Sequence, residues 1–423
     1  MEKQNMRVLW FTNTSSCYSE NGKNTTGGGW ISSLENELKK TPIIKLGICF
    51  YYYKTDKGVI DGTTYYPLNR PSKSILYSLK QIFTDKERAS LEHEDLAVPE
   101  LLKVVNDFKP DIIQVFGSEN IYGILVNHVD IPIVLHIQGV LSTCYNTFLP
   151  PGVSWNDYLF ADRNLKHILS RFSNKFAWSR NVISEQRMFK KIKYVIGRTN
   201  WDKEVSAVLG SAANLTYYHC DEILRDAFYV DKERKTTSKI VFVTTISAFL
   251  YKGYDVVLKT ANILKNTLNL DFEWRVYGWV DTILAEKKSG LHPENVNVRL
   301  MGLVSAEQLQ NALLSATAYV HTSYIENGCN AVGEAQMLGC PCIACNVGGI
   351  NMSIDNNMSG YLVPSNDIYM LAYKMNYLAQ NPKLQKEFGY AGRTAARKRH
   401  DKISIANRVV EIYHDILKRE NRE

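Results

Sequence analysis

Two acidic residues, Glu326 and Glu334, are separated by seven residues in a stretch where their chemistry is easy to place. The apolar run 318–322 precedes them, Glu334 falls in a short helix expected over 331–338, and a second apolar run, 341–345, follows. Strand, loop, helix and strand form the βαβ unit of a parallel sheet, which binds ligands beyond the carboxyl ends of its strands. We therefore expect both carboxylates to lie near a ligand at that edge.

The start of this helix lies between the two carboxylates. A helix N-terminus offers unpaired N–H groups and the positive end of the helix dipole, and both suit a phosphate. Asn330 is a good N-cap, and we expect it and the backbone N–H of Ala331 to contact the ligand. Carboxylates accept paired hydrogen bonds from sugar hydroxyls. A phosphate with a sugar on either side is a nucleoside diphosphate sugar.

Two further segments have residues that suit a diphosphate. Lys252 stands at the start of a helix expected over 253–265, where its ammonium and the helix N–H groups together would clamp a diphosphate. Gly28 and Gly29 follow the first strand and open a helix. Glycine lets the backbone approach a ligand closely, so we expect contact with donor or acceptor; a simple turn is the alternative.

The Glu-x7-Glu pattern, followed by EAQMLGCPCIA and a Gly-Gly loop, resembles the retaining glycosyltransferases of family 4, which have the GT-B fold. The resemblance implies that Glu326 contacts the donor sugar, that Glu334 holds the nucleotide ribose, and that Lys252 grips the donor diphosphate. It covers the second half of the chain well and the first half loosely. The alternative is that both glutamates are ordinary exposed acids near a helix start, where acids are favoured anyway.

The sequence departs from the family pattern at two positions. The family often has an arginine five residues before the lysine, where this chain has Ser247. Arg198, at the end of a strand in the other half, is our candidate for the missing cation. The family histidine aligns with Gln138, and His136 lies two residues earlier. We expect Gln138 to bind the donor and His136 to be catalytic, since only a histidine moves a proton near neutral pH; a core histidine is the alternative.

The length of 423 residues suits two domains of about 200 residues each. We expect an N-terminal acceptor-side Rossmann-like domain over 1–230 and a C-terminal nucleotide-sugar-binding one over 231–403, joined by the polar stretch 231–238. The resemblance implies that the last helix, within 404–423, packs back on the first domain and that the two domains face each other across a cleft. The fold class is thus α/β, GT-B.

The expected strands are 7–12, 43–53, 63–67, 111–116, 133–137, 193–197, 240–244, 272–277, 296–301 and 360–363 beside those named above. The further expected helices are 31–40, 98–108, 121–128, one from 200, and 306–314. Residues 70–95 are polar and irregular, so we expect an exposed loop with some helix.

The formal charge of +7 is concentrated between 163 and 198, where ten Lys and Arg face one acid, Glu185. Aromatic residues are interleaved there. Such a segment fits an anionic membrane surface or a phosphate-bearing acceptor; a solvated helix face is the alternative. No nucleic-acid module accompanies it. The N-terminus reads as a strand and not a signal peptide, and we expect a cytoplasmic protein, peripheral at the inner face of the cell membrane if this segment binds lipid.

Eight cysteines are spread along the chain, and only Cys340, Cys342 and Cys345 cluster. They lack a second pair of metal ligands at suitable spacing, and we expect buried thiols in a reducing cytosol. The Asp-x-Asp metal motif of the other large glycosyltransferase architecture is absent. We therefore expect no metal and no cofactor beyond the nucleotide-sugar substrate.

Taken together, these residues predict a hexosyltransferase that moves a sugar from a uridine or guanosine diphosphate sugar to a hydroxyl of a glycan or lipid-linked acceptor, in polysaccharide or glycolipid assembly. Two alternatives stay open. One is a nucleotide-sugar epimerase or a phosphorylase on the same fold. The other is a non-catalytic subunit that only binds nucleotide sugar or glycan, which Ser247 and Gln138 keep open.

Overall fold

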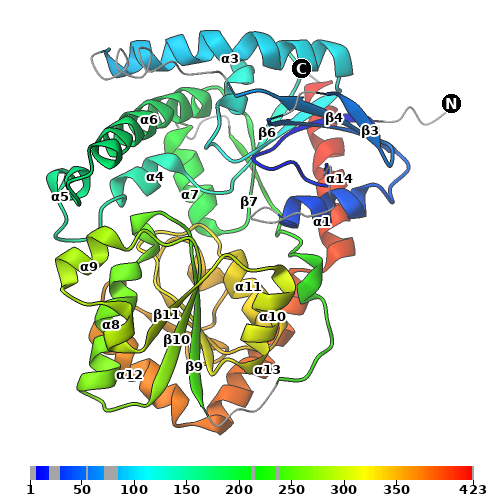
Figure 1. Ribbon diagram of the computed structural model, residues 1–423. Helices are drawn as coiled ribbons and strands as arrows, with labels where there is room; N and C mark the ends of the chain where they lie inside the picture. The colour runs from blue at the N-terminus through cyan, green and yellow to red at the C-terminus, as the bar shows by residue number, and fades with distance from the viewer. Residues whose placement is uncertain are drawn as a thin grey trace. The chain divides into compact units, whose positions relative to one another are not determined.

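The computed structural model (Figure 1) describes residues 6–18, 29–53, 56–70, 84–210, 215–234 and 239–421. The chain divides into two compact units. Unit 1 comprises Met1–Tyr145, Leu169–Ile223 and Asp401–Glu423. Unit 2 comprises Asn146–Ile168 and Leu224–His400. The chain thus passes from unit 1 to unit 2 after Ile223, and its last helix belongs to unit 1.

Unit 1 is built on an eight-stranded sheet with the strand order β3-β4-β2-β1-β5-β6-β7-β8. Each neighbouring pair is parallel except β3 and β4, which are antiparallel. In chain order the strands are β1 (Met6–Phe11), β2 (Ile44–Tyr51), β3 (Gly58–Ile60), β4 (Thr63–Leu68), β5 (Ile112–Phe116), β6 (Ile133–His136), β7 (Tyr194–Gly197) and β8 (Thr216–His219).

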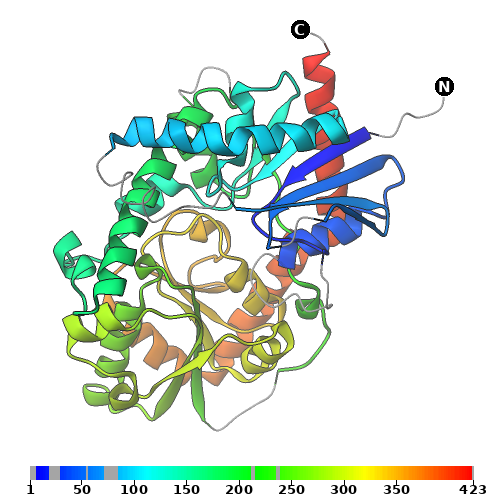
Figure 2. The same ribbon diagram turned by 45° about the horizontal axis from the view of Figure 1, so that its top comes forward.

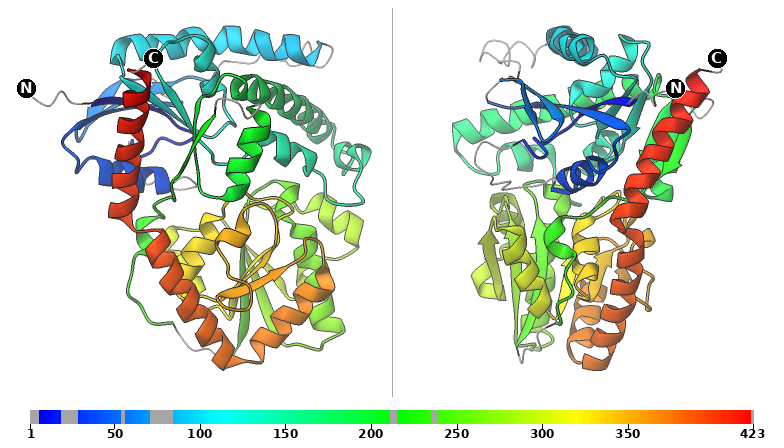
Figure 3. Two further views of the ribbon diagram at one scale, coloured as in Figure 1. Left: turned by 180° about the vertical axis from the view of Figure 1, so that it is seen from behind. Right: turned by 90° about the vertical axis from the view of Figure 1, so that its right-hand side faces the viewer.

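Helices cover both faces of this sheet. The helix α3 (Lys86–Phe108), the 3-10 helix η1 (Ile121–Asn127) and the end of α6 (Leu165–Phe189) pack on one face, where they bury a single apolar cluster (Figure 2). On the other face α1 (Gly29–Leu38) contacts α14 (Lys402–Glu420), as Figure 3 shows. Trp10 donates a hydrogen bond from Nε1 to the hydroxyl of Tyr413 at 2.9 Å, which anchors α14 to β1. The helices α4 (Leu141–Asn146) and α7 (Asn200–Leu209) complete the connections.

Unit 2 has a six-stranded, all-parallel sheet with the order β11-β10-β9-β12-β13-β14. The strands are β9 (Ile240–Ile246), β10 (Phe272–Gly278), β11 (Val298–Gly302), β12 (Ala318–His321), β13 (Cys342–Cys345) and β14 (Gly360–Val363). The helices are α5 (Trp155–Leu159), α8 (Tyr254–Asn266), α9 (Ile283–Ser289), α10 (Ala306–Ser315), α11 (Asn330–Met337), α12 (Ile368–Ala379) and α13 (Pro382–Arg399), with short 3-10 turns η2 (Asp226–Phe228), η3 (Leu250–Lys252), η4 (Pro293–Val296) and η5 (Ile350–Met352).

The two faces of this second sheet hold separate apolar clusters. The helices α8, α9 and α12 bury one face, and α10 and α11 bury the other (Figure 1). Because all strands run in the same direction, the loops after β9, β12 and β13 emerge at one edge of the sheet. These are the loops that contain Lys252, Glu326 and the Gly-Gly pair.

Most expected elements are present, and several have the expected bounds within two residues. The expected strand over 360–363 is β14, and the helix expected over 331–338 is α11, one residue earlier. Residues 70–95 were expected to form an exposed loop with some helix, but from Lys86 onward this segment is wholly helical. Asp85 caps a regular helix that runs from Lys86 through Pro99 to Phe108, while 71–83 lie outside the described residues. The strands β3 and β8 were not predicted.

In the part of the chain that the structure describes, no helix combines the length and the apolar character that crossing a bilayer requires.

Candidate functional site

Lys252 lies in the loop between β9 and α8, and a glycine fixes the backbone there. Gly253 adopts a left-handed conformation, with φ of 77°, and caps α8. A Cβ on Gly253 would lie 2.1 Å from the backbone oxygen of Thr322, so only glycine fits. The hydroxyl of Thr322 donates to the backbone oxygen of Lys252 at 3.0 Å. The lysine is therefore tied to the end of β12, the strand that leads to Glu326.

The side chains of Lys252 and Glu326 meet directly. Nζ of Lys252 lies 2.6 Å from Oε2 of Glu326, and Nε2 of His321 lies 3.5 Å from the same oxygen. The side chain of Glu326 is 13% exposed. Burial raises the pKa of this carboxyl, but the charges and hydrogen bonds of Lys252 and His321 outweigh burial and lower its pKa to about 2. Glu326 is consequently a carboxylate at every physiological pH.

The loop around Glu326 is locked from the other side by the Gly-Gly turn after β13. Gly348 has φ of 53°, and a Cβ there would lie 1.7 Å from the backbone oxygen of Glu326. The N–H of Gly349 donates to that oxygen at 3.2 Å. The Gly-Gly pair therefore has a structural role here, because it allows the close backbone approach that holds the Glu326 loop.

The helix α11 begins directly after this loop. Cys329 is its N-cap residue and its backbone oxygen accepts the N–H groups of Val332 and Gly333 at 3.1 and 3.2 Å. The predicted N-cap, Asn330, is instead the first helical residue. The N–H groups of Asn330 and Ala331 thus precede the first bond within the helix, as an anion-binding helix start requires. The helix start that the sequence predicts is present one residue earlier than expected, and anion binding there stays a prediction.

Glu334, one turn into α11, is held by an arginine that sequence reasoning missed. Arg225 donates from Nε to Oε1 at 2.6 Å and from Nη2 to Oε2 at 2.7 Å, which is the bidentate geometry of a strong ion pair. Burial raises the pKa of Glu334, and Arg225 opposes that rise. Each carboxylate oxygen can accept a further hydrogen bond, so the pair leaves Glu334 able to bind hydroxyl groups.

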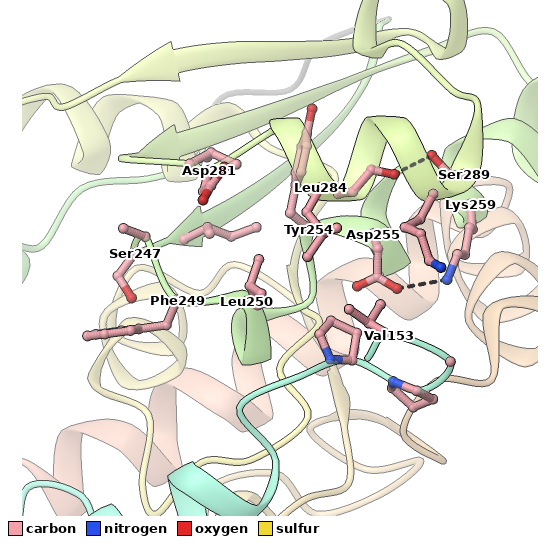
Figure 4. A pocket seen from close by; sticks show the side chains of 18 residues that line it. Val153, Ser247, Phe249, Leu250, Tyr254, Asp255, Lys259, Asp281, Leu284 and Ser289 are labelled. Atoms are coloured by element: carbon pink, nitrogen blue, oxygen red, sulfur yellow. Dashed lines mark hydrogen bonds and ion pairs between the residues drawn. The ribbon is translucent and has the colours of Figure 1, made fainter. Parts of the chain in front are cut away.

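Ser247, which replaces the family's arginine, borders a cavity of about 180 Å³ in unit 2 (Figure 4). Its walls come from the loop 150–153, the loop after β9, and the facing sides of α8 and α9. The two lysines lining it have carboxylate partners: Lys259 lies 2.8 Å from Asp255, and Lys288 lies 3.1 Å from Asp157. Lys252 is paired with a carboxylate as well, and it is the cation of the loop after β9 itself.

In unit 1 three of the predicted site residues meet at one acid, Glu222. Arg198 donates from Nη1 to Glu222 at 2.8 Å, Gln138 donates from Nε2 at 3.0 Å, and Nε2 of His136 lies 3.9 Å away. His136 is 1% exposed. Burial and then the charge of Arg198 lower its pKa to about 3, so its imidazole is neutral at physiological pH. This environment argues against proton transfer by His136 and leaves the guanidinium of Arg198 bound to a carboxylate of its own unit.

The remaining predicted positions are Gly28, Gly29 and the basic segment 163–198. Gly29 is the first residue of α1, whereas Gly28 lies outside the described residues. In the basic segment, Arg171 and Arg180 are buried, and Arg187 lies 2.8 Å from Glu94 of α3. Its one acid, Glu185, is buried too and accepts hydrogen bonds from the backbone N–H groups of Leu141 and Ser142, the first two residues of α4. The exposed cations of the segment are Arg163, Lys166, Lys190, Lys191 and Lys193.

The cysteines behave as expected for thiols without disulfides. All eight are free, and Cys340, Cys342 and Cys345 are buried, with pKa values raised by burial.

Cys329 lies close to two other residues that could bind a metal ion. Cys329, His321 and Glu326 have potential metal-ligand atoms within 4.8 Å of one another, a group found by searching the described residues.

Comparison with known proteins assigns the fold. Residues 226–395 match the family model described as glycosyl transferases group 1. None of the curated proteins compared with the chain matches it. Among solved structures, the sucrose-phosphate synthase of Thermosynechococcus elongatus is 14% identical with a TM-score of 0.71, over 98% of this chain and 100% of that chain.

Two further structures were solved with UDP. HepE of Anabaena, with UDP and glucose, is 14% identical with a TM-score of 0.63, over 97% of this chain and 100% of that chain. A mutant of TarM from S. aureus, with fondaparinux, α-GlcNAc-glycerol and UDP, is 13% identical with a TM-score of 0.64, over 97% and 99%. The chain therefore has the predicted GT-B fold, and residues 226–395 of unit 2 are similar to the group 1 glycosyltransferase family. Membership of family 4 stays a prediction.

Proposed function

We propose that this chain is a retaining hexosyltransferase that moves a sugar from a nucleoside diphosphate sugar to a hydroxyl acceptor. The observation that carries the proposal is the 2.6 Å pair of Lys252 and Glu326 beside the start of α11. Glu334 lies within α11 and is held there by Arg225. These groups supply a cation and helix N–H donors for a diphosphate, and one carboxylate for each sugar that flanks it.

The roles within unit 2 follow from charge. Lys252 and the N–H groups of Asn330 and Ala331 bind the diphosphate and stabilise its negative charge as it departs. Glu334 accepts hydrogen bonds from the ribose hydroxyls. Glu326, which has a pKa of about 2, cannot donate a proton at neutral pH. It binds the donor sugar and stabilises the positive charge that develops at the anomeric carbon.

The unit 1 residues have supporting roles in this proposal. Glu222 fixes Arg198 and Gln138 in one hydrogen-bonded group, from which the amide of Gln138 can still bind a sugar hydroxyl. We assign His136 to packing, since it is enclosed and neutral. We propose that the donor is the only cofactor-like molecule the reaction needs and that no metal is required, because Lys252 and the helix start supply the positive charge.

The donor is proposed to be a uridine or guanosine diphosphate hexose. UDP in the HepE and TarM structures supports uridine. The acceptor is proposed to be a glycan or a lipid-linked glycan, so that the product belongs to polysaccharide or glycolipid assembly. α-GlcNAc-glycerol and fondaparinux in the TarM structure support a glycan-type acceptor.

We place the protein in the cytoplasm, peripheral at the inner face of the membrane. The exposed lysines 166, 190, 191 and 193 support an anionic surface as partner. Co-sedimentation with vesicles containing phosphatidylserine should fall when these four are changed to Gln. Equal binding of both proteins, or none by wild type, would remove the membrane from the proposal.

The test is an assay of UDP- and GDP-hexoses with and without cell-envelope lipid extract. Wild type should transfer sugar only when extract is present. Glu326→Gln should lower transfer by roughly 100-fold, whereas Glu387→Gln, at an exposed position in α13, should leave it unchanged.

Other outcomes would identify a different function. Product without an acceptor indicates an epimerase, and dependence on inorganic phosphate indicates a phosphorylase. Binding of UDP without turnover of any donor in the panel indicates a non-catalytic subunit. Each of these results would contradict the proposed transfer.

A further inference from the structure

Cys329, His321 and Glu326 form a continuous chain of polar contacts in unit 2. Sγ of Cys329 lies 3.7 Å from Nδ1 of His321, and Nε2 of the same ring lies 3.5 Å from Oε2 of Glu326. The two nitrogens of an imidazole point in opposite directions, so the ring bridges thiol and carboxylate. The three residues thus form a relay of polar contacts from the thiol to the carboxylate.

The surroundings hold this relay in place. His321 is 3% exposed and its ring stacks against Tyr319, with ring centroids 6.5 Å apart. Lys252, 2.6 Å from the same oxygen of Glu326, helps to keep that carboxylate ionised. Burial lowers the pKa of His321, but Cys329 and Glu326 outweigh burial and raise its pKa to about 9. A protonated, positively charged ring therefore lies 3.7 Å from the sulfur at neutral pH, where it can stabilise negative charge on the sulfur during an attack.

Cys329 differs in this respect from the five buried cysteines and from Cys17. Cys49, Cys220, Cys340, Cys342 and Cys345 are buried. Cys17 is partly exposed, as Cys329 is, but its charged neighbour is a carboxylate: burial and then Glu35 raise the pKa of the Cys17 thiol to about 12. Cys17 is therefore an internal control of comparable exposure and opposite electrostatic environment.

We propose that Cys329 is a reactive thiol that low-molecular-weight disulfides modify reversibly, and that the adduct blocks the nucleotide site. The second half of this statement rests on the proposed function. In the reaction the sulfur of Cys329 attacks one sulfur of the disulfide. A new S–S bond forms as the thiol of Cys329 releases its proton to solvent. The S–S bond of the reagent breaks, and the departing thiolate takes a proton from His321, which solvent then replaces. Cys329 is oxidised to a mixed disulfide and the reagent is reduced to one free thiol.

The position of the sulfur explains why an adduct would block the site. Cys329 is the N-cap residue of α11 and lies three residues after Glu326. A bulky group on its sulfur would lie at the helix start, where the diphosphate is proposed to bind. If the reagent is glutathione disulfide, the group added to the sulfur also contains carboxylates, and these would compete with the diphosphate for the same N–H donors. A reducing thiol removes the group and restores the site.

The first test measures reactivity alone. Purified protein is treated with iodoacetamide at pH 7.5, and alkylation of each cysteine is followed by peptide mass spectrometry. Cys329 should react at least roughly tenfold faster than Cys17, and His321→Gln should slow Cys329 by a similar factor. Equal rates at the two cysteines would overturn the proposal. This comparison is made within one wild-type molecule, so it holds even if the His321 variant does not fold.

The second test measures the consequence. Wild type is incubated with glutathione disulfide, and the rise in melting temperature caused by UDP is compared before and after treatment. Treatment should abolish the rise, and dithiothreitol should restore it. In Cys329→Ser the same treatment should leave the response to UDP as it was before. A wild-type response that survives full modification of Cys329 would refute the blocking role. Fast alkylation with no UDP response in untreated protein would instead refute the proposed donor and leave the reactive thiol standing.

Discussion

At the scale of single residues, the charge on Glu326 depends on two cations that approach the same oxygen. Nζ of Lys252 lies 2.6 Å from that oxygen and Nε2 of His321 lies 3.5 Å from it. Desolvation alone would favour the neutral acid, yet the net effect lowers the pKa of Glu326 to about 2. The sequence shows Lys252 and Glu326 as members of one family pattern, but His321 reads only as a strand residue. Its contact with a loop residue depends on tertiary structure.

The raised pKa of His321 predicts how stability depends on pH. Its folded pKa of about 9 exceeds the ordinary 6.5, so its stabilising contribution is fully present below pH 6.5 and is lost as the pH rises through 9. A shift of this size corresponds to up to about 3 kcal/mol, at roughly 1.4 kcal/mol per pKa unit. Urea unfolding at pH 6 and pH 9.5 measures the free energy of unfolding. The free energy of wild type should exceed that of His321→Gln by more at pH 6 than at pH 9.5. His292→Gln, at an exposed histidine, should show no such trend, and an equal gap at both pH values would contradict the assigned charge.

Arg225 carries a second prediction at this scale. In Arg225→Ala the buried Glu334 loses its cation, so its pKa rises further and its protonated fraction increases. UDP affinity should fall by roughly tenfold, and recover in part as the pH rises and Glu334 ionises, with a loss of stability of roughly 1–3 kcal/mol. Calorimetric titration measures the affinity. Arg397→Ala breaks an exposed pair with Asp231 and should change neither quantity. An Arg225→Ala protein with wild-type affinity would show that Glu334 does not bind the nucleotide.

At the scale of elements, the loop after β9 depends on the absence of a side chain at Gly253. Ala at this position would place Cβ 2.1 Å from the backbone of Thr322 in a conformation with φ of 77°, so loop and strand must separate. We expect Gly253→Ala to weaken UDP binding by at least roughly tenfold because Lys252 moves with the loop. Gly290→Ala is the matched control, since Gly290 has a similar φ of 67° and nothing within 4 Å of the added carbon. Equal effects of the two variants on UDP binding would mean that strain alone accounts for the loss.

Element boundaries show where sequence reasoning reaches its limit. The strands of unit 2 and its helices α8, α10 and α11 were predicted because large apolar residues mark them, whereas α5 and α9 were not. The helix α3 was found only from Val98 onward, since its first part buries Ala89, Ser90 and Glu94, which give no apolar pattern. The edge strand β8 has four residues and little apolar character. Without β8, Glu222 could not be placed beside Arg198, and the arginine was assigned to the diphosphate.

At the scale of the whole molecule, the family match lies within the part of the chain after 225, whereas the structural matches cover 97–98% of it. The GT-B fold was therefore predictable only through the resemblance in the second half. The passage of 146–168 into unit 2 had no signal in the sequence, since those residues contain ordinary short helices and loops. The fold does not identify the sugar or the acceptor, because those depend on a few side chains.

Hydrogen–deuterium exchange tests the assignment of the nucleotide to one unit. With UDP alone, protection should be largest in the segments 247–253, 323–334 and 346–349, which contain the loops after β9, β12 and β13. The segment 133–139 in unit 1 serves as the reference. Protection that appears first or most strongly in this reference would contradict the assignment.

The central claim is that Lys252 and the start of α11 bind a nucleoside diphosphate. Calorimetric titration of UDP into wild type, Lys252→Ala and Lys383→Ala tests it directly, since Lys383 is an exposed lysine of the same unit. The account predicts that Lys252→Ala raises the Kd by roughly 100-fold, close to the roughly 3 kcal/mol expected for a charge-assisted contact, and that Lys383→Ala binds as wild type does. Equal affinity in all three proteins would contradict it.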